Sequence, residues 1–291
     1  MEKFVALLAS GVAYGAILAL AACGFLVLYK ATGILNFAHA ALIALGAYLA
    51  LWANRDLRLP IVPAYALALV LMFVVGVVLE RIAHAPLRRR SPMVIVIATL
   101  AAALVIQALL SLWQGGNPQA LESPAGDDTF QVAGASIAYQ RMVVVAVAVV
   151  AVVGLLLIFQ RTSLGRQLRA LASDPETAQM YGVRARLVAS LAFGISAVFA
   201  GLAGILVAPL TSVDLTFGFP IMMGAFAAAI LGGFGSLIGI AVGAFLIGIA
   251  QQVVGAYLVP DYADMLPFAL IFVVIAFRPE GLFGRATEAR L

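Results

Sequence analysis

Charged residues are scarce in this sequence. Of its 291 residues, 10% are charged and 65% are hydrophobic, whereas ordinary soluble domains have about 25% and about 45–50%. A soluble fold of this length could not bury so much apolar surface, so we expect most of the chain to be surrounded by membrane lipid. The net charge of +4 could indicate a nucleic-acid partner. However, the arginines lie between apolar runs and form no single patch, so none is expected.

Residues that carry enzymatic chemistry are also missing. Cys23 is the only cysteine, which excludes an internal disulfide. His39 and His84 are the only histidines, and no cluster of histidine, cysteine and carboxylate has metal-ligand spacing. The sequence contains neither a nucleophile elbow nor a phosphate-binding loop with Gly-Lys-Ser/Thr. We therefore expect no enzyme, no cofactor and no metal, and ATP hydrolysis by the usual P-loop route is excluded.

What the sequence does contain is a series of long apolar runs, which predicts an all-α fold, a polytopic transmembrane helical bundle. A helix needs about 20 apolar residues to cross the hydrocarbon core of a bilayer. Three of the runs are short or rich in glycine, so we expect a true count of eight to ten spans, with broken or re-entrant helices among them. Nine segments are visible, near 5–28, 36–53, 60–82, 92–113, 142–160, 187–208, 217–234, 237–258 and 265–278.

Basic residues predict the orientation of these spans. Cytoplasmic loops carry an excess of lysine and arginine, and three clusters hold 12 of the 17 basic residues. The loop 114–140 contains three acidic residues and no basic one, which suits the outside. With nine segments the N-terminus lies outside, and one further span would place it inside. The clusters are Arg81, Arg88, Arg89 and Arg90; Arg161, Arg166, Arg169, Arg184 and Arg186; and Arg278, Arg285 and Arg290.

A short internal similarity suggests a two-half design within a single transmembrane domain, 1–291. The pattern in 35–48 resembles the pattern in 215–226, and each follows the first long apolar run of its half. In the expected topology those two runs point in opposite directions, as inverted repeats require. We therefore expect one half at about 1–160, a cytoplasmic loop at 161–186 and a second half at about 187–291, with a broken helix within 215–258.

A few polar residues interrupt the apolar segments. Asn36 and His39 lie three residues apart, on one helical face of a short segment bounded by glycines, with Phe37 between them. Gln251 is a further polar residue in a long apolar run. Such groups usually form hydrogen bonds between helices. The alternative is that they line the substrate pathway, because the N-terminus of a half-helix offers free backbone groups to a carboxylate.

Glycines mark a second candidate for the substrate pathway. Gly232, Gly233 and Gly235 interrupt the run 215–260, which contains no charged residue. An irregular backbone in lipid must be buried in protein or line a cavity. Close helix packing with a hinge is the simpler interpretation, and direct contact with substrate is the alternative.

The loop 161–186 predicts two short cytoplasmic helices. In the first, Leu164, Leu168 and Leu171 recur at helical spacing beside Arg169. The second begins at Ser173-Asp174-Pro175-Glu176, where Asp174 caps the helix and Pro175 takes its first turn, and it stops at Gly182. A solvated connector is one interpretation. The other is a docking element for a soluble motor, with Ala178 and Tyr181 on its contact side.

Four motifs, in order along nearly the whole chain, resemble the branched-chain amino acid ABC transporter permease family, and in particular the shorter of its two permease subunits. Each motif is weak alone, and together they are specific. They are Gly33-Ile34-Leu35-Asn36-Phe37-Ala38-His39 with Gly46-Ala47-Tyr48; Gly165 to Gly182 with Asp174-Pro175-Glu176; Leu231-Gly232-Gly233-Phe234-Gly235-Ser236; and Arg278-Pro279-Glu280-Gly281-Leu282-Phe283-Gly284.

The resemblance implies a multi-pass inner-membrane subunit of a bacterial ATP-driven importer. Its expected partners are a second homologous permease in a heterodimer, two cytosolic ATPase subunits and an extracytoplasmic solute-binding protein. The cargo would be branched-chain or other hydrophobic amino acids. Ala40 and Gln251 depart from the family pattern, where glycine and often glutamate stand, so urea, short amides or aromatic acids remain alternatives. An ion-coupled secondary transporter is disfavoured because the predicted spans contain so few charges.

Overall fold

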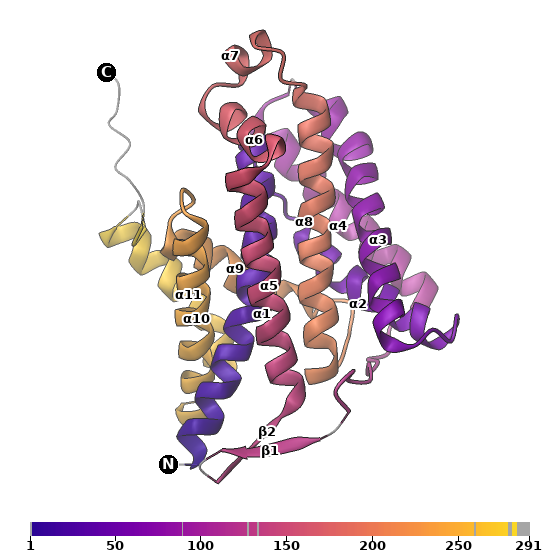
Figure 1. Ribbon diagram of the computed structural model, residues 1–291, viewed down its shortest axis with the longest axis vertical. Coiled ribbons are helices and arrows are strands. Elements are labelled where there is room, and N and C mark those ends of the chain that lie inside the picture. Colours follow the sequence, from indigo (N-terminus) through magenta and orange to yellow (C-terminus); the bar gives the residue numbers. More distant parts are fainter. Residues whose placement is uncertain are drawn as a thin grey trace. The chain divides into compact units, whose positions relative to one another are not determined.

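The computed structural model describes residues 2–88, 90–126, 128–132, 134–258, 260–278 and 281–283 (Figure 1). The chain forms two compact units. Each is assembled from segments that are distant in the sequence. Unit 1 comprises Met1–Cys23, Ala125–Val149 and Pro220–Leu291, and unit 2 comprises Gly24–Pro124 and Val150–Phe219.

Each of the nine predicted segments contains a helix, which confirms the all-α membrane fold. Six helical stretches are long and apolar enough to cross a membrane, whereas α2, α9 and α11 are shorter, at 15 to 18 residues. The helices are α1 (Glu2–Thr32), α2 (His39–Arg55), α3 (Ile61–Leu79), α4 (Pro92–Gln114), α5 (Tyr139–Arg161), α8 (Ala185–Val207), α9 (Gly218–Gly232), α10 (Leu237–Tyr257) and α11 (Pro260–Phe277). The inverted repeat and the division into two halves stay predictions.

The connections contain smaller elements. The loop after α5 forms α6 (Ser163–Ser173) and α7 (Pro175–Met180), as the sequence predicts. α3 continues into a π-helical turn, η1 (Glu80–His84), and a 3₁₀ turn, η2 (Ala85–Leu87), and a second 3₁₀ turn, η3 (Ala208–Leu210), follows α8. An antiparallel hairpin pairs β1 (Thr129–Val132) with β2 (Ala135–Ala138), Thr129 opposite Ala138. This hairpin was not predicted from the sequence.

Unit 2 is built around α8, which packs closely against α2 and α3 at glycine residues. A Cβ atom on Gly46 would lie 2.3 Å from the Cα of Gly201, and one on Gly204 would lie 2.0 Å from the carbonyl oxygen of Ile43. Helices in lipid gain little from apolar burial and associate through close van der Waals contact, which small residues allow. These glycines therefore set the distance between α2 and α8.

The helices of unit 2 differ in burial, which shows which of them lie at its centre and which lie at its surface. The most apolar window of α8 is 78% buried, whereas that of α4 is 17% buried. The exposed positions of α4 include Leu104, Leu109 and Leu112. A helix that exposes such apolar side chains is compatible with lipid and not with water. Unit 2 thus has the surface expected of a membrane protein.

Unit 1 uses the same packing of small residues. A Cβ on Gly248 of α10 would lie 2.4 Å from the backbone nitrogen of Gly15 in α1, and one on Gly15 would lie 2.8 Å from the Cα of Phe245. α10 also packs along α11. Small residues therefore let α1 and α10 approach each other as closely as α2 and α8 do in unit 2.

Candidate functional site

Asn36 is buried at the entrance to α2 and is held there by the backbone. Its Oδ1 atom accepts a hydrogen bond from the backbone N–H of Ala38 at 3.0 Å, and its side chain is only 3% exposed. This bond fixes the orientation of the amide, so the Nδ2 donor points elsewhere and has no partner in the described structure. A buried donor without a partner costs about 1–3 kcal/mol. Such a group is a candidate contact for a transported polar group.

The residues around Asn36 form a compact polar cluster inside unit 2. The N–H of Phe37 donates to the hydroxyl of Thr99 in α4 at 3.2 Å. The ring of His39 packs edge-to-face on Phe25, with centroids 5.9 Å apart. A Cβ on Gly24 would lie 3.0 Å from the carbonyl oxygen of Ser196 and 3.3 Å from Cε1 of His39. The predicted residues Asn36, Phe37 and His39 are therefore brought together with α4 and α8.

The start of α9 packs against the first turn of α2. A Cβ on Gly218 would lie 2.2 Å from the carbonyl oxygen of Ala40. The first residue of one short helix therefore lies directly on the first turn of another. Amide groups at both helix starts carry partial positive charge.

The glycines of the second candidate, Gly232 and Gly233, form the turn between α9 and α10 in unit 1. Gly233 has a φ of +83°, a conformation that side chains disfavour. A Cβ on Gly232 would lie 2.3 Å from the backbone of Gly239, so the two helices touch at this point. Gly235 is exposed, with open space where a Cβ would stand. This geometry explains the glycines by packing and turn formation, and their contact with substrate stays a prediction.

Gln251 lies in α10, buried at 4% exposure. Its Nε2 donates to the carbonyl oxygen of Ala263 in α11 at 3.1 Å, which is the interhelical role expected of a lone glutamine. Its Oε1 has no hydrogen-bond partner among the described residues and would lie 3.6 Å from a Cβ on Gly224 of α9. One end of this amide therefore joins two helices, and the other is a buried acceptor.

The apolar face of α6 is buried against the chain itself. Leu168 is 0% and Leu171 is 6% exposed. Arg169 donates to the carbonyl oxygen of Phe159 at the end of α5, and a Cβ on Gly165 would lie 2.2 Å from the same oxygen. This apolar face therefore covers the chain's own core, which makes α6 a fixed platform.

The start of α7 is capped as the sequence predicts. The Asp174 carboxylate accepts hydrogen bonds from the N–H groups of Glu176 at 3.0 Å and Thr177 at 3.2 Å. The Thr177 side chain and backbone N–H hold the pKa of Asp174 below its usual value. Pro175 occupies the first turn, and Gly182 follows the helix with a φ of +85°. The capping therefore stabilises α7 fully at pH values above the ordinary pKa of aspartate. This stabilisation is lost as the pH falls through the lowered pKa of Asp174.

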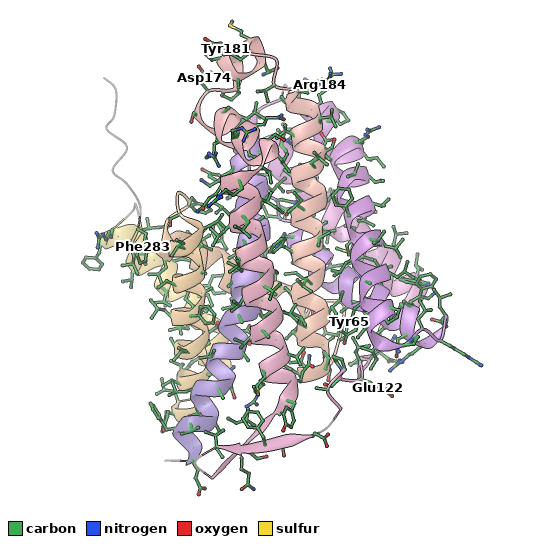
Figure 2. All side chains as sticks on the ribbon, viewed as in Figure 1. Tyr65, Glu122, Asp174, Tyr181, Arg184 and Phe283 are labelled. Atoms are coloured by element: carbon green, nitrogen blue, oxygen red, sulfur yellow. The ribbon has the colours of Figure 1, made fainter. Side chains whose placement is uncertain are left out.

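The exposed part of this segment is its tip. Met180 and Tyr181 are each 86% exposed, and Figure 2 shows Tyr181 directed away from the helices at the same end of unit 2 as Asp174 and Arg184. Ala178 is only 5% exposed, so it faces the chain and not the solvent. The sequence placed Ala178 and Tyr181 on one contact side, and the burial of Ala178 corrects that arrangement. Glu122, from the acidic loop, lies at the opposite end of unit 2 (Figure 2).

Comparison with known proteins decides the family. The model of the family described as "Branched-chain amino acid transport system / permease component" matches residues 7–275. The permease LivH of Escherichia coli K12 is 30% identical over 95% of this chain and 94% of its own length. BraD of Pseudomonas aeruginosa is 29% identical over 96% and 95%. The chain belongs to the branched-chain amino acid permease family.

A solved structure is similar in fold alone. It is PsaBC from Streptococcus pneumoniae in complex with Fab, with a TM-score of 0.53, 12% identity and coverage of 96% of this chain and 93% of that chain. Membership in the permease family, together with the apolar helices, makes this chain a multi-pass protein of the bacterial inner membrane and a transport subunit, not an enzyme. Among the described residues, no group of three histidine, cysteine, aspartate or glutamate side chains could hold a metal ion.

Two of the family motifs meet in the permease fold. The N–H of Leu282 donates to the carbonyl oxygen of Leu231 at 2.7 Å, and a Cβ on Gly281 would lie 2.6 Å from the nitrogen of Gly233. The C-terminal motif therefore closes over the glycine turn within unit 1. Several residues that the sequence singled out lie outside the described residues, namely Arg89, Asp127, Pro279, Glu280, Gly284, Arg285 and Arg290, and the side chain of Asp261 is not described.

Sequence reasoning missed Glu80 as a functional candidate of this permease. It is 2% exposed, at the end of α3, and pairs with Arg88. The sequence contained a usable signal, because Glu80 falls inside the predicted span 60–82 and acidic residues in spans are rare and commonly functional.

Proposed function

We propose that this permease is the membrane subunit of an ATP-driven importer whose motor docks on α7. The observation that carries the proposal is the α6–α7 segment. α6 is fixed to the chain's own core, while Met180 and Tyr181 present an exposed apolar tip. Large apolar and aromatic side chains exposed at one point are typical of protein interfaces.

The proposed assembly has two cytosolic ATPase subunits, a second homologous permease and an extracytoplasmic solute-binding protein. This chain has no nucleotide-binding motif of its own, so hydrolysis belongs to separate subunits. ATP binding would move the motors, and α6–α7 would carry that movement into the helices. Specificity would then rest mainly with the binding protein, which agrees with a largely apolar path.

Branched-chain amino acids are the proposed cargo, because the similar permeases are named for the transport of these solutes. The polar cluster at Asn36, Phe37 and His39 would meet the charged end of the solute on its way through. Urea, short amides or aromatic acids are the alternative cargo, since Gln251 supplies an uncharged acceptor where a carboxylate would attract an ammonium group.

The function is tested by uptake into proteoliposomes that contain the complete complex. We expect uptake of radiolabelled leucine to require ATP on the motor side and to continue when ionophores collapse proton and sodium gradients. An ion-coupled carrier, the alternative class, needs buried ionisable groups along its path. Uptake driven by an ion gradient without ATP would support that alternative and contradict the importer.

Asn36→Leu should lower the rate of uptake at least about tenfold, because the variant removes a buried donor that a polar solute group could use. Leucine has the same number of side-chain heavy atoms and a similar branched outline, so assembly with the ATPase should persist. The control is Asn54→Leu, because Asn54 of α2 donates to the nearby carbonyl of Leu59, at 3.0 Å, and lies outside the cluster around Asn36. Equal uptake by the Asn36→Leu variant and the unmodified complex would leave Asn36 with a structural role alone.

A further inference from the structure

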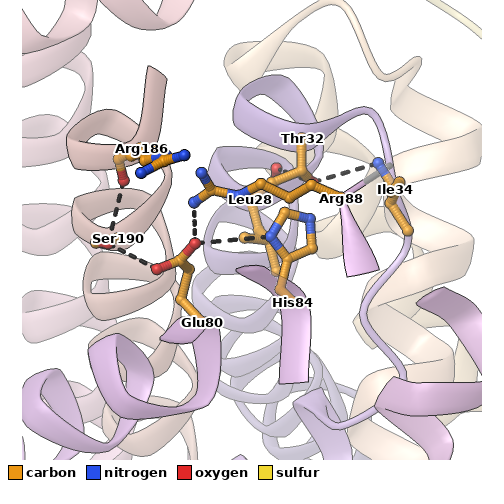
Figure 3. A network of polar contacts seen from close by, with 8 residues as sticks. All are labelled: Leu28, Thr32, Ile34, Glu80, His84, Arg88, Arg186 and Ser190. Carbon is orange, nitrogen blue, oxygen red and sulfur yellow. Dashed lines mark hydrogen bonds and ion pairs between the residues drawn. The ribbon is translucent and has the colours of Figure 1, made fainter. Parts of the chain in front are cut away.

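A buried ionic network joins the end of α3 to the beginning of α8 (Figure 3). Glu80 is 2% exposed, and its Oε1 forms an ion pair with the guanidinium of Arg88. Its Oε2 accepts a hydrogen bond from the hydroxyl of Ser190 at 2.7 Å. Nδ1 of His84 lies 3.8 Å from Oε1. Both carboxylate oxygens are therefore engaged, one within its own segment and one across to α8.

The local backbone explains why these residues converge. Pro86 has no N–H and cannot continue the α-helical ladder of α3. The helix widens instead into the π-helical turn η1, in which the N–H of Ala85 donates to the carbonyl oxygen of Glu80. π-helical turns of this kind are frequent at functional sites. The irregular turn brings Glu80, His84 and Arg88 into one network.

The contact with α8 is broader than one hydrogen bond. Phe193, three residues after Ser190, packs its ring against His84, with centroids 5.1 Å apart. One turn earlier in α3, a Cβ on Gly76 would lie 2.4 Å from the carbonyl oxygen of Phe193. Glu80 is thus a buried carboxylate at one end of a closely packed helix pair.

The position of Ser190 places this network close behind the proposed docking tip. α7 ends at Met180, and α8 begins at Ala185, with the N–H of Val183 bonded back to the carbonyl oxygen of Ala178. Ser190 follows after five residues, about 8 Å along the helix axis. A displacement of α7 therefore reaches Ser190 through a short connection and a rigid helix.

We propose that Glu80, held by Arg88 and Ser190, is a positioning residue that couples α8 to α3 and so transmits the movement of the docked motor into the membrane helices. The proposal rests on the proposed function. A buried carboxylate at this place is expensive unless all of its partners stay in reach. The buried carboxylate therefore favours conformations in which α3 and α8 move together. If one helix slid past the other, Glu80 would lose its hydrogen bond to Ser190 and remain buried without that partner.

Ser190→Ala is the sharpest test, because it removes the link across to α8 and leaves the Glu80–Arg88 pair in place. We expect the number of solute molecules transported per ATP to fall about tenfold, as the loss of a hydrogen bond to a charged group shifts an equilibrium by that factor. ATP hydrolysis should persist, and the unfolding temperature should fall by only about 2–4 °C, the effect expected when one such bond is lost from a chain of this size. A purely structural contact would lower stability and transport together.

Ser10→Ala provides the matched control. Ser10 of α1 donates to the carbonyl oxygen of Ala6 at 2.8 Å, and Ser190 lies in the same way 3.1 Å from the carbonyl oxygen of Arg186. Ser10 has no carboxylate partner among the bonds of the described structure. The control should therefore leave the transport-to-ATP ratio unchanged.

Glu80→Gln gives an independent measurement. Glutamine keeps the length of the side chain and loses the charge that holds Arg88, so coupling should again fall. Groups that act as one unit give non-additive effects. The double variant Glu80→Gln/Ser190→Ala should therefore be no worse than the poorer single variant.

Two results would overturn the proposal. One is an unchanged transport-to-ATP ratio in both single variants, and the other is a loss of transport that merely follows a lowered unfolding temperature. The unmodified complex distinguishes this failure from a failure of the proposed function. If unmodified complex transports without ATP, the importer itself is refuted, whereas ATP-driven uptake with fully coupled variants refutes only the role of Glu80.

Discussion

Gly204→Ala should separate α8 from α2 and abolish stable assembly of the permease. The added Cβ would lie 2.0 Å from the carbonyl oxygen of Ile43, a backbone atom that cannot rotate away. Overpacking costs about 1–3 kcal/mol where side chains can adjust. Here whole helices must move, so we expect a loss at or above about 3 kcal/mol. The measurement is thermal unfolding of the purified complex in detergent, together with its yield in the membrane.

The control for that variant is Gly154→Ala in α5. A Cβ at Gly154 meets no atom within 4 Å, and alanine is the better helix former by up to about 1 kcal/mol. We expect this variant to be neutral or slightly more stable. If both variants behaved alike, the close approach of α2 and α8 would not determine the stability of unit 2.

Tyr181→Asp should abolish solute-stimulated ATP hydrolysis while the permease still inserts and folds. Tyr181 is 86% exposed and supports no core packing, so the variant should change the stability of the chain little. At a motor interface the same change would introduce a charge where an aromatic side chain is buried, and such positions cost about 2–4 kcal/mol or more. The stimulated rate should fall at least about thirtyfold. ATPase assays of the reconstituted complex measure it.

Two further variants serve as controls for this result: Tyr181→Phe, which is conservative, and Ala178→Asp, which is disruptive. The phenylalanine variant keeps the ring and should retain most of the stimulated activity. Ala178 is buried against the chain, so an aspartate there should displace α7 itself and lower both stability and coupling. If Tyr181→Asp were fully active, the exposed tip of α7 would not contact the motor.

Local signals in the sequence predicted the helices and their caps well. Apolar runs gave all nine helical segments, because lipid requires long uninterrupted helices. The Ser173-Asp174-Pro175-Glu176 pattern predicted the start of α7, since capping depends on adjacent residues alone. The hairpin at 129–138 was missed. Its strands have four residues each and lie in a loop without a strong alternating pattern.

The site was less predictable because burial and pairing depend on residues that are far apart in the sequence. Nothing local shows that Leu168 covers the chain's own core or that Ala178 faces inward beside an exposed Tyr181. The role of Glu80 was not recognised from the sequence, since its partner Ser190 is 110 residues away. The close contacts of Gly204 and Gly218 likewise become visible only when the helices are packed.

Labelling of single cysteines tests the central claim, that α7 is a cytoplasmic docking site for an ATPase, most directly. A cysteine is introduced at Tyr181 in a chain in which buried Cys23 is replaced by alanine. We expect it to form a crosslink with an ATPase subunit in isolated membranes and to resist a membrane-impermeant maleimide added outside intact cells. A cysteine at Glu122 should show the opposite accessibility. Labelling of the Tyr181 position from outside, without any crosslink to an ATPase, would contradict both the docking role and the orientation of the chain.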